Sequence, residues 1–480
     1  MDADFEVVIG LEVHVELKTE SKIFCGCSTA FGAEPNTQCC PICIGMPGTL
    51  PVLNEQVVRY AVKAGLATNC SITAYGKQDR KNYFYPDIPK AYQISQYDLP
   101  LCTGGYLDIE AEDGLKRIGI TRIHIEEDAG KLIHKEGGGT LIDYNRCGVP
   151  LIEIVSEPDL RSAAQVRAYL TKLRAILLYA GVSDCRMNEG SLRCDVNLSV
   201  RRRGEKAFGT RTEMKNLNSF QFITKAIEYE ADRQIKLIKA GEKVVQETRR
   251  YDQASGKTYS MRKKEDAHDY RYFPDPDLAP ITVSDDLKSA LLAEIPELPD
   301  ARKKAYVSRY GISAYDAEQL VSDRGIADYF EKSAALTAYP KLLANLIITE
   351  VFRLLPPESA DIPVSPEHMA ALATLSGEGR INSSVAKLLL SEMWENDRDP
   401  ALIVAERGLE QVSDEGELAR LVDEVLAENP RSVVDFKKGK EKALQALVGR
   451  MMAKTRGKGN PQKIQALLRA RLSDGEKREN

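Results

Sequence analysis

Apolar side chains occupy alternate positions in two stretches of the first three hundred residues, which is the pattern of a strand with one covered face. Residues 5–18, FEVVIGLEVHVELK, form the first stretch and residues 190–203 the second. Strands of this kind are typical of an antiparallel sheet with one buried face. The polar faces carry ionisable groups at Glu12 and His14 and at Asp195. A Glu and a His two apart on a strand could bind one ion or its waters, although a solvated face is the alternative.

Helices are predicted between these strands, because apolar residues recur there at spacings of three and four. Three such helices are expected, over residues 54–68, 162–180 and 219–241. Each begins at an Asn or a Ser, whose side chain can accept a hydrogen bond from the first free backbone N–H groups. The second and third end at a Gly, which suits a helix stop. We expect these helices to cover the sheet.

One predicted strand carries a carboxylate where its pattern predicts burial. Residues 149–155 are apolar on both faces, as in a central covered strand, yet Glu153 lies in the middle. A buried carboxylate needs a metal ion, a basic side chain or a shared proton as its partner. We favour a metal ion such as Mg²⁺, which binds carboxylate oxygens, because acidic groups close the preceding apolar segment. That segment ends with His124, Glu126, Glu127 and Asp128, of which the last three could also form a solvated turn.

Two segments combine basic and aromatic residues. Residues 77–96 interleave Arg80, Lys81 and Lys90 with tyrosine and phenylalanine rings, and two prolines predict a loop without regular structure. Residues 247–280 repeat the combination. Basic groups complement phosphates and rings can stack on a base, so a nucleotide or an RNA end is a candidate ligand. A packed aromatic loop is the alternative.

The pattern becomes helical after residue 295, which gives an α+β fold class overall. An N-terminal cradle domain, 1–295, is expected to hold the sheet, followed by an all-α domain, 296–403, and a small all-α tail, 404–480. In the tail, Ser413 and Pro430 are predicted to start helices. A length of 480 residues agrees with two or three domains.

Composition indicates an ordinary soluble protein, with 43% hydrophobic and 29% charged residues. We expect a cytoplasmic location, because no apolar run spans a bilayer and the first residues lack the basic region of an export signal. The net charge of -5 conceals a contrast. Residues 431–471 hold twelve Lys and Arg against two acids, a charge of +10. Such a basic tail indicates a polyanionic partner such as nucleic acid, with a merely soluble helical face as an equal alternative.

Five of the ten cysteines lie close together, between residues 25 and 43. Paired cysteines in a chain without an export signal favour a metal over a disulfide. Four of them could form a tetrahedral structural zinc site, namely Cys25, Cys27, Cys40 and Cys43. Cys39 would be left over, and a loop of free thiols is the alternative.

Several catalytic motifs are absent from the sequence, including the P-loop, the dinucleotide-binding glycines and the nucleophile elbow. Phosphate binding would therefore depend on side chains and a metal ion. No serine or cysteine nucleophile with a base is apparent, so amide hydrolysis on this chain is not expected.

A set of longer motifs gives a resemblance to a known family over nearly the whole chain. In order they are GLEVHVEL, DRKNYFYPDIPKAYQISQ, HIEEDAGK, PLIEIVSEPD, GSLRCDVN, EMKNLNSF and DYRYFPDPDL. They resemble those of the GatB family, whose members are subunits of the bacterial tRNA-dependent amidotransferases. The resemblance implies a ligase that corrects Glu-tRNA(Gln) or Asp-tRNA(Asn). ATP would phosphorylate the side-chain carboxylate, and ammonia would displace phosphate to give the amide.

The resemblance also implies partners and site residues. An amidase subunit (GatA-like) would supply ammonia, a small third subunit (GatC-like) would join the two, and the tail would bind tRNA. Magnesium would be held by Glu12, His14, Glu127 and Glu153, with Asp195 nearby as a further catalytic residue. The phosphates of ATP would meet Arg80, Lys81 and Lys90. Zinc at the four cysteines is an optional feature of the family.

Two other interpretations compete with this one. In the first, the chain is a non-catalytic tRNA-binding scaffold of the same complex and its acidic cluster is structural. In the second, it is a free-standing ligase that uses free ammonia. The first interpretation predicts that phosphate release dependent on ATP and tRNA continues when the acidic cluster is altered. The second predicts that the isolated chain amidates its substrate.

Overall fold

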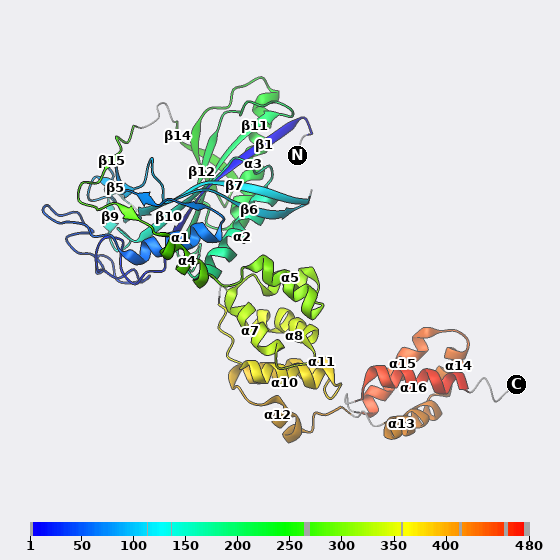
Figure 1. The fold of residues 1–480 in the computed structure, drawn as a ribbon. Coiled ribbons are helices and arrows are strands. Elements are labelled where there is room, and N and C mark those ends of the chain that lie inside the picture. The colour runs from blue at the N-terminus through cyan, green and yellow to red at the C-terminus, as the bar shows by residue number, and fades with distance from the viewer. Residues whose placement is uncertain are drawn as a thin grey trace. The chain divides into compact units, whose positions relative to one another are not determined.

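A computed structural model describes residues 3–112, 114–135, 137–263, 269–356, 359–411, 415–455 and 459–474. The chain divides into two compact units, Met1–Pro299 and Asp300–Asn480 (Figure 1). The first unit contains a mixed sheet with helices and the second is helical, so the predicted α+β fold class is confirmed. The further division of the helical part at residue 404 stays a prediction.

The first unit is built on a sheet of nine strands in the order β14-β13-β12-β11-β1-β10-β7-β6-β2. Its pairs are antiparallel except for β12 and β13, which run parallel. The strands are β1 (Phe5–Glu16), β2 (Ser71–Ile72), β6 (Cys102–Ala111), β7 (Gly114–Glu127), β10 (Pro150–Ser156), β11 (Leu192–Arg202), β12 (Thr212–Lys215), β13 (Glu247–Asp252) and β14 (Lys257–Lys263). The first strand of the chain therefore lies at the centre of the sheet, between β10 and β11.

Helices α1 (Glu55–Ala67), α2 (Ala163–Ala180) and α3 (Phe220–Lys239) pack against the sheet, as predicted (Figure 1). The expected caps are present, since Asn54, Ser162 and Ser219 accept hydrogen bonds from backbone N–H groups at the helix starts. Gly181 ends α2 in the left-handed conformation, with φ 69°. The apolar face of the sheet and these helices form one continuous core. The polar face of the strands is left for other groups.

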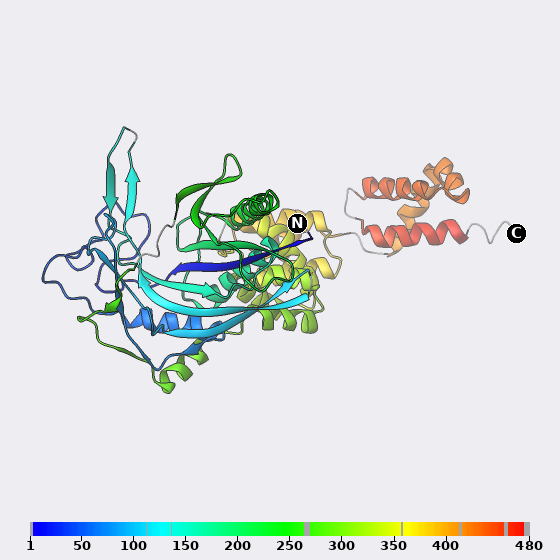
Figure 2. The same cartoon turned by 90° about the horizontal axis from the view of Figure 1, so that it is seen from above.

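Smaller strands complete the unit, and one prediction about them was wrong. Residues 77–96 were expected to lack regular structure, but they contain β4 (Asp79–Asn82) and β5 (Tyr92–Ser95). The two prolines lie between these strands and therefore interrupt no ladder. The short strand β15 (Phe273–Pro274) pairs with β4, so the two basic and aromatic segments come together in one sheet. The remaining elements are β3 (Tyr75–Gly76), β8 (Lys131–His134), β9 (Thr140–Asp143), β16 (Ile281–Thr282) and α4 (Asp285–Glu294). Figure 2 shows the β8–β9 hairpin extending away from the large sheet.

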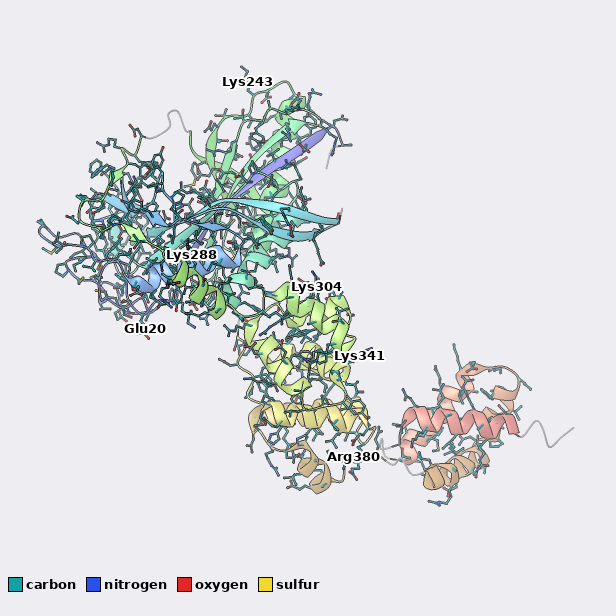
Figure 3. All side chains as sticks on the ribbon, viewed as in Figure 1. Glu20, Lys243, Lys288, Lys304, Lys341 and Arg380 are labelled. Atoms are coloured by element: carbon teal, nitrogen blue, oxygen red, sulfur yellow. The ribbon has the colours of Figure 1, made fainter. Side chains whose placement is uncertain are left out.

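The second unit contains two separate apolar cores among its described residues. The first core joins α5 (Pro299–Tyr310), α6 (Ala314–Leu320), α7 (Arg324–Ala334), α8 (Pro340–Leu346), the π-helical turn η1 (Ile347–Val351), α9 (Phe352–Leu354), α10 (Pro366–Gly377), α11 (Ser383–Glu395) and α12 (Pro400–Arg407). The second joins α13 (Glu415–Glu428), α14 (Pro430–Lys437), α15 (Glu441–Lys454) and α16 (Pro461–Asp474). In Figure 3, Lys304 and Lys341 mark α5 and α8.

Two details of the tail bear on the predictions made for it. Pro430 is the first residue of α14, as expected. The predicted cap at Ser413 lies outside the described residues. Among the helices that the structure describes, none is long and apolar enough to cross a membrane.

Candidate functional site

The candidate site lies on the polar face of the central strands β7, β10, β1 and β11. Residues directly opposite each other in paired strands share a face of the sheet. His14 on β1 opposes Glu153 on β10, and Glu153 in turn opposes His124 on β7. Glu12 opposes Asp195 on β11. Four strands that are far apart in the sequence therefore place ionisable side chains side by side.

His14, Glu126 and Glu153 form the first cluster. Nε2 of His14 lies 3.5 Å from Oε2 of Glu153 and 3.7 Å from Oε1 of Glu126. His124 also contacts this cluster, since its Nε2 lies 3.5 Å from Oε2 of Glu153. One potential ligand atom from each of the three clustered residues lies within 4.8 Å of the others. Two carboxylates and an imidazole at this separation could hold a divalent cation.

The close contact between His14 and Glu153 shifts the pKa values of both groups. Burial lowers the pKa of His14, but the hydrogen bond and the charge of Glu153 outweigh burial and raise it to about 9. For Glu153, burial raises the pKa, whereas the hydrogen bond from His14 and the charge of His124 bring it well below its usual range. The protonated imidazole of His14 therefore supplies positive charge beside the carboxylate of Glu153.

Glu12, Asp195 and Glu213 form a second acidic cluster beside the first. Glu12 accepts a hydrogen bond of 2.9 Å from Nδ2 of Asn197. The pKa of Glu12 is raised, first by burial and then by the charge of Glu153 on one side and of Asp195 and Glu213 on the other. Glu12 thus lies between the two clusters, and Asp195 opposes it across β1 and β11 on the same polar face. A catalytic role for Asp195 stays a prediction.

Glu127 lies on the other side of β7. Successive strand residues point to opposite faces, so Glu126 and Glu127 cannot both join His14. The carboxylate of Glu127 accepts hydrogen bonds from Nζ of Lys90 at 2.5 Å and from the backbone N–H of Ile94 at 2.9 Å. The structure therefore brings Glu126, and not Glu127, next to Glu153. A metal-binding role for Glu127 stays a prediction.

The three basic residues expected at ATP phosphates lie in different surroundings. Arg80 donates to Oδ2 of Asp275 at 2.8 Å, and its guanidinium stacks on a tyrosine ring. Lys90 is paired with Glu127. The ammonium of Lys81 lies 5.1 Å from the ring centroid of Tyr270, and its charge acts on Glu153. Of the three basic residues, Lys81 is the one whose charge lowers the pKa of a residue in the first cluster, Glu153.

The four predicted zinc ligands come together. One sulfur from each of Cys25, Cys27, Cys40 and Cys43 lies within 4.8 Å of the others, although the first pair is separated from the second by twelve residues. Four thiols at this separation fit a tetrahedral zinc ion. Cys39 is left outside this group, and its thiol contacts the carbonyl of Asn36 at 3.2 Å.

Sequence patterns alone did not single out every residue of the site. Glu126 and His124 were noted in the acidic segment, but the choice between Glu126 and Glu127 needed the strand register. Glu213 and Lys215 were given no role from the sequence. Their signal was the short alternation of residues 212–215 beside the longer strand that contains Asp195.

Comparison with known proteins identifies the family. The sequence model of the GatB/GatE catalytic domain matches residues 7–289, and that of the GatB domain matches residues 328–472. This chain belongs to the GatB family. A relative from Caldicellulosiruptor saccharolyticus is 57% identical over 98% of this chain and 99% of its own. A relative from Caldanaerobacter subterraneus is 56% identical over the same shares. Each of the two is named as a subunit of aspartyl/glutamyl-tRNA(Asn/Gln) amidotransferase.

The GatB family places the chain in a tRNA-dependent amidotransferase, which is a ligase. The catalytic-domain match contains both acidic clusters and the cysteine group. The second match begins within the helical unit and extends to α16. The resemblance drawn from the sequence motifs is therefore confirmed.

Proposed function

We propose that this GatB chain carries the centre at which a glutamate or aspartate, esterified to tRNA(Gln) or tRNA(Asn), is phosphorylated by ATP and then amidated. The His14, Glu126 and Glu153 cluster is the single observation that carries the proposal. It gathers three ligands for a cation from three strands on the polar face of the sheet. A scaffold that only binds tRNA has no need for such a group.

In the first reaction step, the substrate carboxylate attacks the γ-phosphorus of ATP. A carboxylate oxygen forms a bond to phosphorus while the bond to ADP breaks, and the leaving oxygen takes the electron pair. A bound Mg²⁺ would supply positive charge for the two anions that must approach each other. His14, Glu126 and Glu153 would hold it, because carboxylate oxygens are its preferred ligands and these three lie within reach of one point. Glu12 lies beside them, between the two acidic clusters.

In the second step, ammonia attacks the carbonyl carbon of the acyl phosphate, and phosphate leaves with the bonding electrons. The acyl phosphate is already activated, so the protein has mainly to position the reactants and exclude water. An amidase subunit would supply the ammonia, and a small third subunit would join the assembly.

Lys81 lies near the rings of Tyr83 and Tyr270, so these three residues combine a cation with rings that suit a nucleotide base.

Two other regions support binding roles within the same proposal. The four clustered cysteines would hold a structural zinc ion, since four thiolates leave no open ligand position for chemistry. The tail would bind the tRNA, because residues 431–471 carry a charge of +10 in the sequence and the described helices of the tail have a core of their own.

The assembled complex, with its amidase partner, tests the proposal. Glu153→Gln should abolish phosphate release that depends on ATP and misacylated tRNA, while glutamine hydrolysis on the partner continues. Glu20→Gln, at an exposed position outside the sheet, is the matched control. Unchanged turnover in the Glu153 variant would favour the non-catalytic scaffold.

A further inference from the structure

The ammonium of Lys215 closes the second acidic cluster. Its Nζ lies 2.5 Å from Oδ2 of Asp195 and 3.0 Å from Oε1 of Glu213. The Lys215 side chain is 41% exposed, whereas those of Asp195 and Glu213 are 18% and 11% exposed. The charged group therefore lies at the outer side of the cluster, with two carboxylates beneath it.

Several contacts fix this lysine in place. Glu213 is itself held, because the hydroxyl of Thr248 on β13 donates to its Oε2 at 3.0 Å. Strand β12, which carries Lys215, is paired on both sides, with β11 and β13. The next residue, Asn216, has φ 64°, a backbone conformation that is uncommon outside glycine and often found at functional sites. The chain thus turns sharply where the lysine side chain leaves the strand.

Lys215 also shares its electrostatic surroundings with the first cluster. Asp195 opposes Glu12 across β1 and β11, and Glu12 is two residues from His14 on the same strand face. The charge of Asp195 acts on both Glu12 and His14. Burial lowers the pKa of Lys215, but the charges of Asp195 and Glu213 outweigh it and raise this pKa. Lys215 therefore stays a cation throughout the range in which a transfer reaction would run.

We propose that Lys215 is a further catalytic residue, whose ammonium binds the phosphoryl group during its transfer, and that Asp195 and Glu213 are positioning residues acting through it. The inference rests on the proposed function, because it needs phosphoryl transfer beside His14 and Glu153. Lys215 forms and breaks no covalent bond. It donates hydrogen bonds to the oxygens of the phosphoryl group while the bond to ADP breaks and the bond to the substrate carboxylate forms.

This assignment explains a feature that a cation site alone leaves open. If the two carboxylates served only as metal ligands, a lysine in contact with both would hinder them, because its ammonium and the metal ion carry like charges and repel each other. An ammonium held by two fixed carboxylates, in contrast, is already oriented and loses little freedom when the phosphoryl group arrives. Asp195 then contributes to catalysis without touching the substrate.

The test uses the assembled complex and measures phosphate release that depends on ATP and tRNA. Lys215→Met keeps the side-chain length and removes the charge, and we expect it to lower kcat about 100-fold, with the KM for tRNA nearly unchanged. Lys215→Arg, which keeps a cation, should retain more activity than Lys215→Met. The control is Lys236→Met on α3, a lysine that also pairs with an acid, Asp232, but is 74% exposed. It should leave kcat unchanged.

The positioning role has its own readout. Asp195→Asn should lower kcat about tenfold, as expected for the loss of one orienting interaction, and leave the KM for tRNA unaltered. Asp195→Glu should recover part of the loss, because it restores a carboxylate. A Lys215→Met complex with kcat within threefold of the wild type would overturn the inference. Lys215→Gln keeps the test open should the methionine variant not assemble.

Failure of the inference and failure of the proposed function are distinguishable. A wild-type complex that releases no phosphate with ATP and misacylated tRNA would remove the proposed function and the inference together. An active wild type with an equally active Lys215→Met variant would remove the inference alone. Glutamine hydrolysis by the partner, measured in every variant, reports whether the complex has assembled.

Discussion

Lys90 and Glu127 form an ion pair on the side of β7 away from His14, with Nζ of the lysine 2.5 Å from Oε1 of the glutamate. Both side chains are nearly buried, at 11% and 5% exposed. The pair explains why two consecutive glutamates have different surroundings. Glu126 contributes to the candidate cation cluster, whereas Glu127 neutralises a lysine.

Substituting the two glutamates separately should give different results. Glu126→Gln is expected to lower phosphate release about 100-fold and to change the melting temperature little, because it removes a cation ligand. Glu127→Gln leaves Lys90 buried without its counter-charge and should cost about 3 kcal/mol of stability. Turnover assays and thermal unfolding of each variant measure both effects. Lost turnover in Glu127→Gln at an unchanged melting temperature would instead support Glu127 as the ligand.

The carboxyl group of Glu16 should make the stability of the fold depend on pH. The pKa of Glu16 is raised from 4.5 to about 8, first by burial and then by the charge of Asp128. Between these values the folded chain holds a proton that the unfolded chain has lost, so stability falls as pH rises through this window. A pKa difference of one between the folded and unfolded chain corresponds to about 1.4 kcal/mol of stability.

The glutamine of Glu16→Gln cannot ionise, so this variant should not lose stability as the pH rises. Relative to the wild type, its melting temperature should rise from pH 5 to pH 9, by an amount that grows with pH. Glu20→Gln, an exposed neighbour, should show no such trend. Parallel curves for the wild type and Glu16→Gln would show that Glu16 is ionised in the folded chain.

The cysteine cluster predicts one tightly bound zinc ion per chain. Elemental analysis of the purified complex should find it, and Cys43→Ser should lose it and lower the melting temperature. Cys39→Ser is the control, because its thiol lies outside the four-sulfur group. Wild-type protein without zinc, or a Cys43 variant that retains it, would favour a loop of free thiols.

The basic tail should contribute tRNA affinity through phosphate contacts. Removing residues after Val404 is expected to weaken tRNA binding and to flatten its dependence on salt, because fewer counterions are released. Glutamine hydrolysis by the partner should be unaffected. Binding measured at several salt concentrations tests this, and Arg450→Ala should produce a smaller effect in the same direction, since its side chain is exposed on α15. An unchanged salt slope would contradict the assignment.

The sequence predicted the covered sheet well, because each major element had a complete local signal. Strand β1 alternates from Leu11 to Glu16, and α2 had a serine cap, apolar periodicity and a terminal glycine. The strands β4 and β5 were missed, since each has only four residues and the prolines between them masked the pattern. The parallel pairing of β12 with β13 had no local signal at all. Strand order is a long-range property that alternation does not encode.

The same distinction applies to the site. Glu12, His14 and Glu153 could be predicted, because a carboxylate or imidazole on a strand face is visible in the alternation. Glu126 could not be preferred over Glu127, since the choice depends on register against β10. The partners of Arg80 and Lys90 also come from other segments, so their use in ion pairs was hidden.

The central position of β1 has a consequence for how the chain matures on the ribosome. Its neighbours β10 and β11 lie far along the chain, and Glu12 meets its partner Asp195 only across that interval. At about 5–20 residues per second, the earliest-made strand waits roughly 7 to 28 seconds before the first of these neighbours, β10, has been made. Its apolar side chains stay unsheltered during this delay, when chaperones would be most needed. Nascent fragments that stop short of β11 will lack half of the acidic centre, however well their helices form.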